Sequence, residues 1–470
     1  MIVDIVLGRA IGRGGLEKVL TIVSNELKNR GHRVRVCQMF EPDFKDWTET
    51  LPEIHYYCRR NIDSKQPTNI NQMAIGYSEL ITQIGIPDIV LATHTPIFGA
   101  VCKMAFSSLE IKCPPIISWL HGPPEAYGGS GLLKYCDAHL AISHSISKKI
   151  ENVIGAKTSI HYVGNPVNID ESNIIYRPKY IYEFLYIGRL NNNEKRLDIM
   201  FRAMSKLRGN WRLHIYGDGP NKNELKILAN RLGINNRVKW HGWKENPWEE
   251  IKEASLLLLS SDIEGFGLVL IEALSRGIPV LSTNCDGPKE IIQEGINGWL
   301  YQVRDISTLY KKLQEIINGD INLPEIKICR ESVLHYSPQI VVNSIEEILK
   351  TYYLKDKIEK EISLVPDLSE EDKAQLIFEL VIENQLNINV LFSIIQKNFS
   401  NDVKSTWLTR IGVLFWEHQL FDYVIPTFQK AIEYNPNNDD ALLNLGYVLR
   451  NIGEEELALS YLNKVKNINN

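Results

Sequence analysis

The 470-residue chain has no apolar run close to the ~18 consecutive residues that a membrane-spanning helix requires. Its seven cysteines are scattered and never form a C-x-x-C pair, so buried free thiols are expected rather than disulfides or a zinc site. The chain opens with the strand-like Ile2–Leu7, and no basic, apolar leader precedes that run. These absences exclude a membrane-spanning or disulfide-stapled protein. They predict a cytoplasmic one, for which peripheral association with a membrane stays open.

The chain also lacks a concentrated basic segment. Its 52 Lys and Arg residues stand against 57 Asp and Glu, which gives a formal net charge of −5. Residues 351–470 carry 11 basic and 18 acidic side chains, so the acidic balance comes from the C-terminal part. A nucleic-acid-binding protein presents a basic face to the phosphates. The charge distribution therefore argues against nucleic acid as a partner.

Short apolar runs alternate with amphipathic stretches in the first part of the chain. Within 16–30, apolar residues recur at spacings of three and four, which predicts a helix, and Gly31 follows where a C-terminal cap belongs. The strand candidates are 2–7, 34–38, 89–92, 116–119, 139–142 and 159–163. Alternation of strands and helices predicts a parallel sheet with helices on both faces.

The same alternation begins again near Tyr182. Strands are expected at 183–187, 212–216, 238–240, 256–259 and 279–282, and helices at 197–207, 221–232, 248–253, 268–276 and 288–294. The two stretches predict an α/β protein with two Rossmann-like, doubly wound domains, 1–175 and 176–355, that face a cleft. Because open α/β sheets bind ligands at the carboxyl ends of their strands, the chemistry is expected there.

Residues 356–470 show no strand-like run and contain a repeat of 34 residues. Gly412 and Gly446 are one period apart, and so are Phe428 and Leu462. Small residues where paired helices touch, with bulky residues opposite them, are typical of tetratricopeptide repeats. The pattern predicts an all-α, tetratricopeptide-like C-terminal domain.

A third, degenerate repeat is expected at 371–404, with Phe378 at the position of the small residue. Stacked repeats form concave surfaces that bind peptides or proteins. The domain therefore predicts a protein partner or self-association, and the alternative is a structural brace.

Gly12-Arg13-Gly14-Gly15 lies between the first strand and the first helix. A glycine turn at a helix N-terminus lets backbone amides approach a phosphate. The spacing differs from the G-x-G-x-x-G of dinucleotide sites, which disfavours a nicotinamide oxidoreductase. Such turns are also common structural joints, so the motif does not define a site by itself.

Charged residues and glycines gather where strands of the second domain end. Arg189 follows one strand, and Lys195 comes six residues later in a polar loop. Glu264 precedes Gly265-Phe266-Gly267, and Glu272 lies on the helix that follows. Cations bind phosphates and carboxylates bind hydroxyls, so this set suits a sugar attached to a diphosphate.

Several segments match one family in order. Between residues 184 and 303 they are F-L-Y-I-G-R-L with the following E-K, L-H-I-Y-G-D-G-P, E-G-F-G-L-V-L-I-E-A-L-S-R-G-I-P-V and G-P-K-E-I-I-Q-E-G-I-N-G-W-L. The first domain agrees more loosely, through G-G-L-E-K-V-L, G-H-R-V-R-V and an H-G after a strand. Together they resemble the GT-B glycosyltransferases of family 4. The stretch W-H-G-W-K-E-N-P-W is most similar to lipopolysaccharide galactosyltransferases.

The resemblance implies a role for each matching position. Arg189 and Lys195 are implied to bind the donor diphosphate and to stabilise it as the leaving group. Glu264 is implied to contact the donor sugar, Glu272 the ribose hydroxyls, and His121 the sugar from across the cleft. Gly14 and Gly15 are implied to approach the phosphates or the acceptor. The other implied donor-binding residues are Gly188, Gly217, Gly265, Phe266, Gly267 and Leu268.

Each position also has a purely structural interpretation. Arg189 and Lys195 can be solvated surface charges, and His121 can anchor a loop. His94, at another strand end, is expected to be structural. Trp243 either borders the base of the donor or belongs to the core.

The sequence D-x-D does not occur in the chain. Metal-dependent GT-A transferases use that motif to hold a divalent ion on the diphosphate. The family resemblance therefore implies no metal site and no cofactor, with fixed cations in place of the ion.

The sequence thus predicts a retaining, metal-independent glycosyltransferase. It would transfer a hexose-type sugar from a nucleotide sugar, in particular a UDP-sugar, to a glycan, lipid-linked or protein acceptor. Two alternatives stay open: a sugar-nucleotide epimerase or sugar-phosphate synthase on the same fold, and an inactive scaffold that carries repeats. Donor consumption that depends on an acceptor distinguishes the transferase from both.

Overall fold

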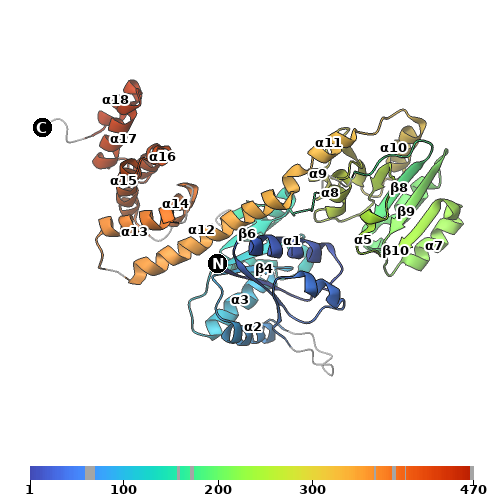
Figure 1. The fold of residues 1–470 in the computed structure, drawn as a ribbon, viewed down its shortest axis with the longest axis horizontal. Coiled ribbons are helices and arrows are strands. Elements are labelled where there is room, and N and C mark those ends of the chain that lie inside the picture. Colours follow the sequence, from blue (N-terminus) through green and yellow to red (C-terminus); the bar gives the residue numbers. More distant parts are fainter. Residues whose placement is uncertain are drawn as a thin grey trace. The chain divides into compact units, whose positions relative to one another are not determined.

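The computed structural model describes residues 1–58, 69–155, 159–169, 174–364, 367–383, 388–396 and 399–465. The chain forms two compact units, Met1–Glu346 and Glu347–Asn470 (Figure 1). The division falls within the long helix α12, Pro338–Leu364. The domain boundaries at 175 and 355 stay predictions.

The first unit begins with a seven-stranded parallel sheet in the order β3-β2-β1-β4-β5-β6-β7. Its strands are β1 Ile2–Leu7, β2 Arg33–Gln38, β3 Ile54–Tyr56, β4 Ile89–Thr93, β5 Ile116–Leu120, β6 Ala138–Ala141 and β7 Ser159–Tyr162. The helices are α1 Gly15–Asn29, α2 Ile70–Ile84, α3 Ile97–Ser108 and α4 His144–Ile154, and α2 and α3 lie side by side (Figure 1). All six expected strands are present. The short β3 was missed because its residues are only half-buried and give little apolar signal.

Helix α1 forms where the apolar spacing predicts it. Its apolar stripe, which is buried, consists of Val19, Leu20, Val23 and Leu27. Gly31 has a φ of +88°, the left-handed conformation that ends helices and that glycine adopts at little cost. Strand order in this sheet reverses between β1 and β4, so the loops that follow these strands diverge and leave a crevice at their carboxyl ends.

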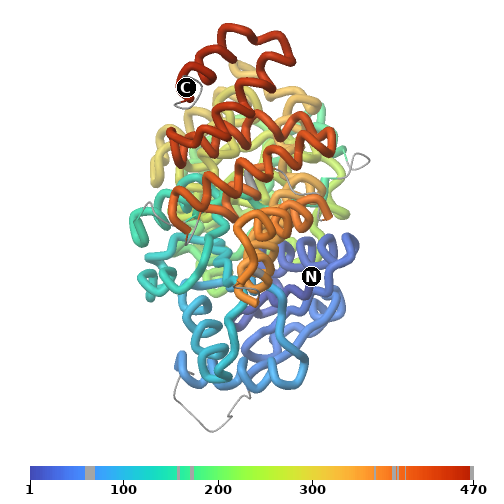
Figure 2. Tube along the Cα trace, turned by 90° about the vertical axis from the view of Figure 1, so that its left-hand side faces the viewer, coloured from blue at the N-terminus to red at the C-terminus, as the bar shows by residue number. Residues whose placement is uncertain are grey.

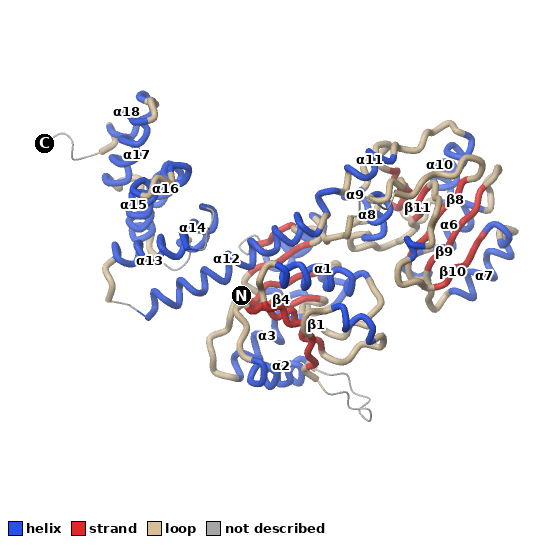
Figure 3. Tube along the Cα trace, in the orientation of Figure 1, coloured by secondary structure: helices blue, strands red, loops and turns tan. Residues whose placement is uncertain are grey.

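The second half of the first unit contains a six-stranded parallel sheet in the order β10-β9-β8-β11-β12-β13 (Figure 3). Its strands are β8 Tyr182–Ile187, β9 Trp211–Tyr216, β10 Val238–Gly242, β11 Leu256–Leu258, β12 Val280–Thr283 and β13 Gly298–Tyr301. The helices include α5 Asn192–Lys195, α6 Leu197–Met204, α7 Lys222–Arg231, α8 Leu268–Leu274, α9 Pro288–Ile291, α10 Ile306–Asn318 and α11 Ile326–Glu331. The two Rossmann-like sheets confirm the predicted fold class.

Two expected helices are wrong or too long. The helix expected at 248–253 is only the 3-10 turn Pro247–Glu249, because Glu253 pairs with Tyr176 in a β-bridge and the chain is extended there. The helix expected at 288–294 ends at Ile291. The Asn297 side chain ends it, since its Nδ2 donates to the Ile291 carbonyl and its Oδ1 accepts from the Gln293 amide.

The described part of the second unit is all helical: α13 Glu370–Glu383, α14 Ile388–Ile395, α15 Asn401–Glu417, α16 Phe421–Tyr434, α17 Asp439–Asn451 and α18 Glu455–Leu462. From α15 onward the trace runs back and forth in paired helices (Figure 2). A Cβ atom at Gly412 would lie 2.7 Å from the Phe428 ring, and one at Gly446 would lie 2.5 Å from Leu462 Cδ2. Small residues are therefore favoured where these helices touch, which agrees with the tetratricopeptide-like character predicted for the tail.

The degenerate repeat expected at 371–404 includes 384–387 and 397–398, which lie outside the described residues. In the described part, Phe378 packs edge-on against Phe415, with ring centroids 5.4 Å apart. None of the helices in the described ranges has the combined length and apolar character that a bilayer crossing requires.

Candidate active site

Two loops at the carboxyl ends of strands bring the expected cation and carboxylate together. Lys195 ends α5 in the loop after β8, and Glu264 lies in the loop after β11. Lys195 Nζ lies 2.6 Å from Glu264 Oε2, and these side chains are 20% and 19% exposed. Arg189 is exposed in the same loop as Lys195, and no described residue bonds to its guanidinium. The site therefore has one cation paired with a carboxylate and one that is open to solvent.

Glycines let the neighbouring turns approach one another. A Cβ atom at Gly217, whose φ is +147°, would lie 1.9 Å from the Gly188 carbonyl oxygen. The Gly188 amide donates to the Tyr216 carbonyl, and the Gly217 amide donates to the Gly242 carbonyl. Glycine at position 217 is thus required by backbone packing, whereas a Cβ atom at Gly188 would lie 3.1 Å from the Tyr186 hydroxyl oxygen. Contact of either glycine with a donor stays a prediction.

The loop 264–268 faces residues of the first sheet domain. A Cβ atom at Gly265 would lie 2.7 Å from the His121 carbonyl oxygen, and one at Gly15 would lie 3.0 Å from Leu268 Cδ1. Gly267 caps α8 with a φ of +97°. The Phe266 side chain is buried against Tyr336, so a donor would meet its backbone rather than its ring.

Glu272 is held by partners that sequence reasoning did not name. Lys18 Nζ donates to its Oε1 at 2.9 Å, and Trp248 Nε1 donates to its Oε2 at 3.0 Å. Burial raises the pKa of Glu272, but Lys18 and Trp248 together lower it by more. The pKa therefore lies below its usual value. The carboxylate is therefore ionised at neutral pH. The signal for Lys18 was available in G-G-L-E-K, which begins at Gly14.

His121 follows β5 and lies against Trp119, with ring centroids 4.5 Å apart. Burial and, to a lesser extent, the nearby His94 lower its pKa to about 3, so the imidazole is neutral. Its Nε2 is buried, and no described residue bonds to it. The ring therefore offers one unsatisfied hydrogen-bonding atom and no charge. His94 Nδ1 is likewise buried without a described partner, in a residue with a φ of +81°.

The glycine turn before α1 is organised by Glu17, a second residue of G-G-L-E-K. Glu17 Oε1 accepts from the amides of Ile11 at 3.1 Å and Gly12 at 3.0 Å. Gly14 is the N-cap of α1 in extended conformation, and Gly15 is the first helical residue. The carboxylate thus occupies the first amides of the turn, while Gly14 and Gly15 lie at the positive end of a fifteen-residue helix.

Arg13, in the same turn, has its guanidinium carbon 3.5 Å from the centroid of the Phe44 ring and 3.8 Å from that of Trp243. Trp243 is 40% exposed, so it belongs to the surface rather than to the core. The stacking joins the two sheet domains of the first unit. Whether Trp243 borders the base stays a prediction.

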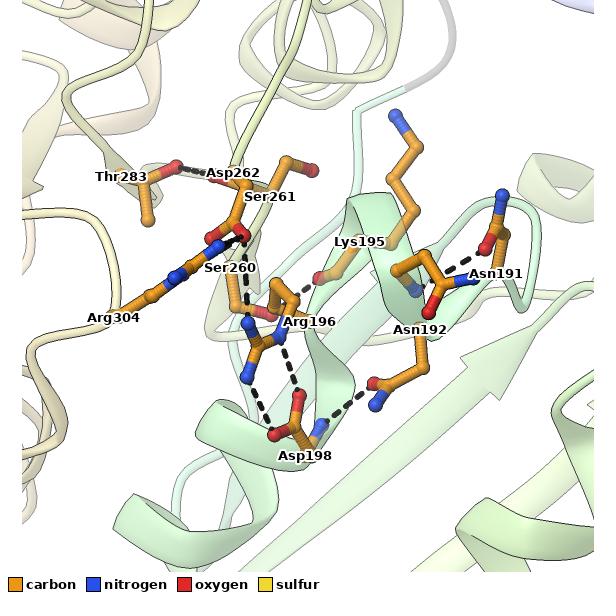
Figure 4. A network of polar contacts seen from close by, with 11 residues as sticks. Asn191, Asn192, Lys195, Arg196, Asp198, Ser260, Ser261, Asp262, Thr283 and Arg304 are labelled. Atoms are coloured by element: carbon orange, nitrogen blue, oxygen red, sulfur yellow. Dashed lines mark hydrogen bonds and ion pairs between the residues drawn. The ribbon is translucent and has the colours of Figure 1, made fainter.

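A polar network lies beneath the Lys195 loop (Figure 4). Arg196 forms two bonds of 2.9 Å to the Asp198 carboxylate and one of 3.4 Å to Asp262 Oδ2. Arg304 also donates to Asp262 Oδ2, at 3.0 and 2.6 Å. Among the described residues, no cluster of three or more His, Cys, Asp or Glu side chains is arranged to hold a metal ion.

Two Rossmann-like parallel-sheet domains, with a cation and a carboxylate at strand ends of the second, have the architecture of GT-B glycosyltransferases. Comparison with protein families agrees: glycosyltransferase family 4 matches residues 13–171, glycosyl transferases group 1 matches 171–328, and a tetratricopeptide repeat matches 427–460.

Individual relatives agree as well. Lipopolysaccharide 1,6-galactosyltransferase of Escherichia coli (strain K12) is 36% identical over 252 residues, which are 52% of this chain and 69% of that protein. The Salmonella typhimurium protein of the same name is 30% identical over 364 residues, 74% of this chain and 96% of the relative. The chain belongs to glycosyltransferase family 4, and it is a glycosyltransferase.

Solved structures share the fold of the first unit. Lipopolysaccharide outer core galactosyltransferase WaaB in its apo form has a TM-score of 0.64 and 27% identity, and the match covers 74% of this chain and 98% of that one. Anabaena HepE in complex with UDP and glucose has a TM-score of 0.61 at 18% identity, with 75% and 100% of the two chains covered.

Proposed function

We propose that this protein transfers galactose from UDP-galactose to a glycan acceptor of the lipopolysaccharide type, with retention of configuration and without a bound metal. The observation that carries the proposal is the Lys195–Glu264 pair, 2.6 Å apart at the strand ends, with the exposed Arg189 in the same loop. The relatives named as galactosyltransferases support the choice of sugar and acceptor.

In the proposed mechanism, Arg189 and Lys195 bind the donor diphosphate. Lys195 then exchanges Glu264 for phosphate oxygens, which frees the carboxylate to accept a hydrogen bond from the sugar. Glu272 accepts hydrogen bonds from the ribose hydroxyls, and these replace the hydrogen bond that Lys18 donates to it. Since negative charge grows on the diphosphate as the glycosidic bond breaks, the two cations stabilise the transition state more than the bound substrate.

The sugar develops oxocarbenium character as its bond to the diphosphate breaks. The acceptor hydroxyl forms the new bond to the anomeric carbon on the same face, and its proton passes to the departing diphosphate. We assign no nucleophilic carboxylate and therefore no covalent intermediate. His121 is proposed to hydrogen-bond a sugar hydroxyl through its unsatisfied Nε2. A buried polar atom without a partner costs about 1–3 kcal/mol, so a hydroxyl at this position gains binding energy from it.

Metal independence has its own test. Because fixed cations would neutralise the diphosphate, turnover should persist in excess EDTA. Complete loss on chelation, with recovery on addition of Mg²⁺ or Mn²⁺, would show that an ion holds the diphosphate instead.

The transfer reaction is tested with a panel of sugar nucleotides, each with and without a truncated lipopolysaccharide acceptor. Acceptor-dependent UDP release, a mass increase of one hexose and an α-linked product by NMR are expected for UDP-galactose. Interconversion of the donor without an acceptor would indicate an epimerase. A scaffold would turn over none of the donors.

We further propose that the helical tail of the second unit recruits a partner protein that presents the acceptor, or joins two copies of the chain. The close helix pairing at Gly412 and Gly446 supports a stacked-repeat surface, and the excess of acidic side chains in 351–470 favours a neutral or basic ligand.

A further inference from the structure

The loops that carry Lys195 and Glu264 are bonded to each other below the site. The Asp262 amide donates to the Glu194 carbonyl at 2.8 Å, and Ser260 Oγ donates to the Lys195 carbonyl at 2.9 Å. The first bond ends on the residue before Lys195 and the second on Lys195 itself, so both join the backbone that carries Lys195 to the loop that carries Glu264. The separation of the two functional side chains is therefore set by how firmly these loops are held together.

Asp262 is the centre of this connection (Figure 4). Its carboxylate is only 11% exposed, and its Oδ2 accepts from both Arg196 and Arg304. Its Oδ1 is buried and has no hydrogen-bond partner in the described part of the chain. One carboxylate thus ties the β11 loop to the residue after Lys195 and to the segment after β13.

Both arginines reach Asp262 from unfavourable backbone conformations. Arg196 has a φ of 48° and a ψ of 44°, and Arg304 has a φ of 65°. Residues with a Cβ atom seldom adopt this left-handed region, whereas glycine adopts it without a steric penalty. Such local strain persists only where the surrounding structure compels it, and it is concentrated at functional sites. Two strained arginines that share one carboxylate therefore point to a requirement beyond local stability.

We propose that Asp262, held by Arg196 and Arg304, is a positioning residue that keeps Lys195 and Glu264 in the arrangement needed by the transition state. The inference rests on the proposed roles of those two residues at the donor. None of the three network residues is assigned a contact with the donor. A displacement of about 1 Å at a reacting group can lower a rate by about 10²-fold, so a loosened loop should affect turnover before it affects binding.

The test uses Arg196→Gly in the full chain, because glycine accepts the left-handed backbone while the whole side chain, with its bonds to Asp262 and Asp198, is removed. The matched control is Glu110→Gly, which replaces an exposed residue with a φ of 54° in the first sheet domain. We expect Arg196→Gly to lower kcat by about tenfold or more, with the donor KM changed less than about threefold and the melting temperature close to that of the wild type. Glu110→Gly should leave all three quantities unchanged.

Asp262→Asn is the second variant, since it keeps the shape of the side chain and removes its charge. A shared positioning role predicts that the double variant Arg196→Gly, Asp262→Asn is no slower than the worse single variant, because both remove the same connection. Arg196→Lys keeps the positive charge but lacks the planar guanidinium that bonds two carboxylates. Its kcat should lie between those of Arg196→Gly and the wild type.

If Arg196→Gly and Asp262→Asn both keep the wild-type kcat, the inference is wrong. It is also wrong if kcat falls only in proportion to the fraction of protein that remains folded. The wild-type reaction in the same assay distinguishes failure of this inference from failure of the proposed function. If the wild type does not use UDP-galactose, the assignment of the donor fails, and the variants are compared with whichever sugar nucleotide of the panel is consumed.

Discussion

The Asp4–Arg35 pair of the first sheet and the Lys195–Glu264 pair of the second are built from similar groups in different surroundings. Asp4 lies on β1 and Arg35 on β2, with Nε 2.5 Å from Oδ1 and both side chains 0% exposed. Tyr77 adds a hydrogen bond to Asp4 Oδ2 at 2.7 Å. The Lys195–Glu264 pair has a similar distance but lies at strand ends, where each side chain remains about one-fifth exposed.

This difference shows how the surroundings decide what an ion pair does. The buried pair cannot exchange partners, because water and ligands do not reach it, so it serves the packing of β1, β2 and α2. The pair at the strand ends can exchange its partners for those of a ligand at little cost. Removing one charge should therefore unfold the first region but only inactivate the second.

The largest effect is expected for Arg35→Ala. It leaves the Asp4 carboxylate buried without its cation, which typically costs about 3–5 kcal/mol of folding free energy. Urea unfolding followed by circular dichroism measures the loss. The control is Arg33→Ala on the same strand, where an exposed pair with Glu53 is removed and little change is expected. Equal losses for both variants would contradict the distinction between the buried and the exposed pair.

Lys195→Ala and Arg189→Ala should lower activity and leave stability unchanged. Each is expected to lose about 2–4 kcal/mol of transition-state stabilisation, while the melting temperature stays near that of the wild type. Steady-state kinetics with the identified donor measures this loss, and the exposed Lys206→Ala on the same domain is the control. Turnover within about threefold of the wild type in both variants would remove these residues from the site.

The two carboxylates should separate kinetically. Glu264→Gln is expected mainly to lower kcat, because its proposed partner is the reacting sugar. Glu272→Gln is expected mainly to raise the donor KM, because ribose contacts are similar in the ground and transition states. Matching changes of kcat and KM in both variants would contradict the assigned roles.

Truncation after Leu364 tests the second unit. Donor binding and slow donor hydrolysis should be retained, because the candidate site lies in the first unit. Transfer to the native acceptor should fall by about tenfold, equivalent to about 1.4 kcal/mol. Size-exclusion chromatography then distinguishes recruitment of a partner from self-association. A truncated enzyme of unchanged oligomeric state and full transfer rate would show that the tail does neither.

The smallest effect concerns pH. Because the pKa of Glu272 is lowered, its carboxylate stays ionised as the pH falls through about 4.3, where an ordinary glutamate takes up a proton. The donor KM should therefore stay constant down to that pH. In Lys18→Ala, which removes a cation that lowers this pKa, the KM should begin to rise at a higher pH. Identical pH profiles of the two proteins would show that Lys18 has no influence on Glu272.

Local patterns in the sequence predicted much of this architecture. The apolar spacing of α1, the strand-like runs of both sheets and the 34-residue period through Gly412 and Gly446 report short-range sterics and burial, and these are properties of neighbouring residues. The motifs also placed Arg189, Lys195 and Glu264 in loops at strand ends and Glu272 on the helix that follows, and the roles of these residues remain to be tested.

Where the pattern failed, a contact with a residue outside the expected helix had replaced a bond within it. The segment 248–253 has helical spacing, yet Glu253 pairs with Tyr176 instead. The helix that begins at Pro288 stops early because Asn297 takes its hydrogen bonds.

The sequence by itself determined the elements of this protein, their order and the family to which it belongs. Only the tertiary structure decided the partners of the site: Lys18 on Glu272, which is 254 positions away, and Arg196 and Arg304 on Asp262. Periodicity reports which face of an element is buried, whereas the choice of a polar partner depends on how separate elements pack. That packing also explains why Arg196 holds a backbone conformation that its sequence neighbours alone would not favour.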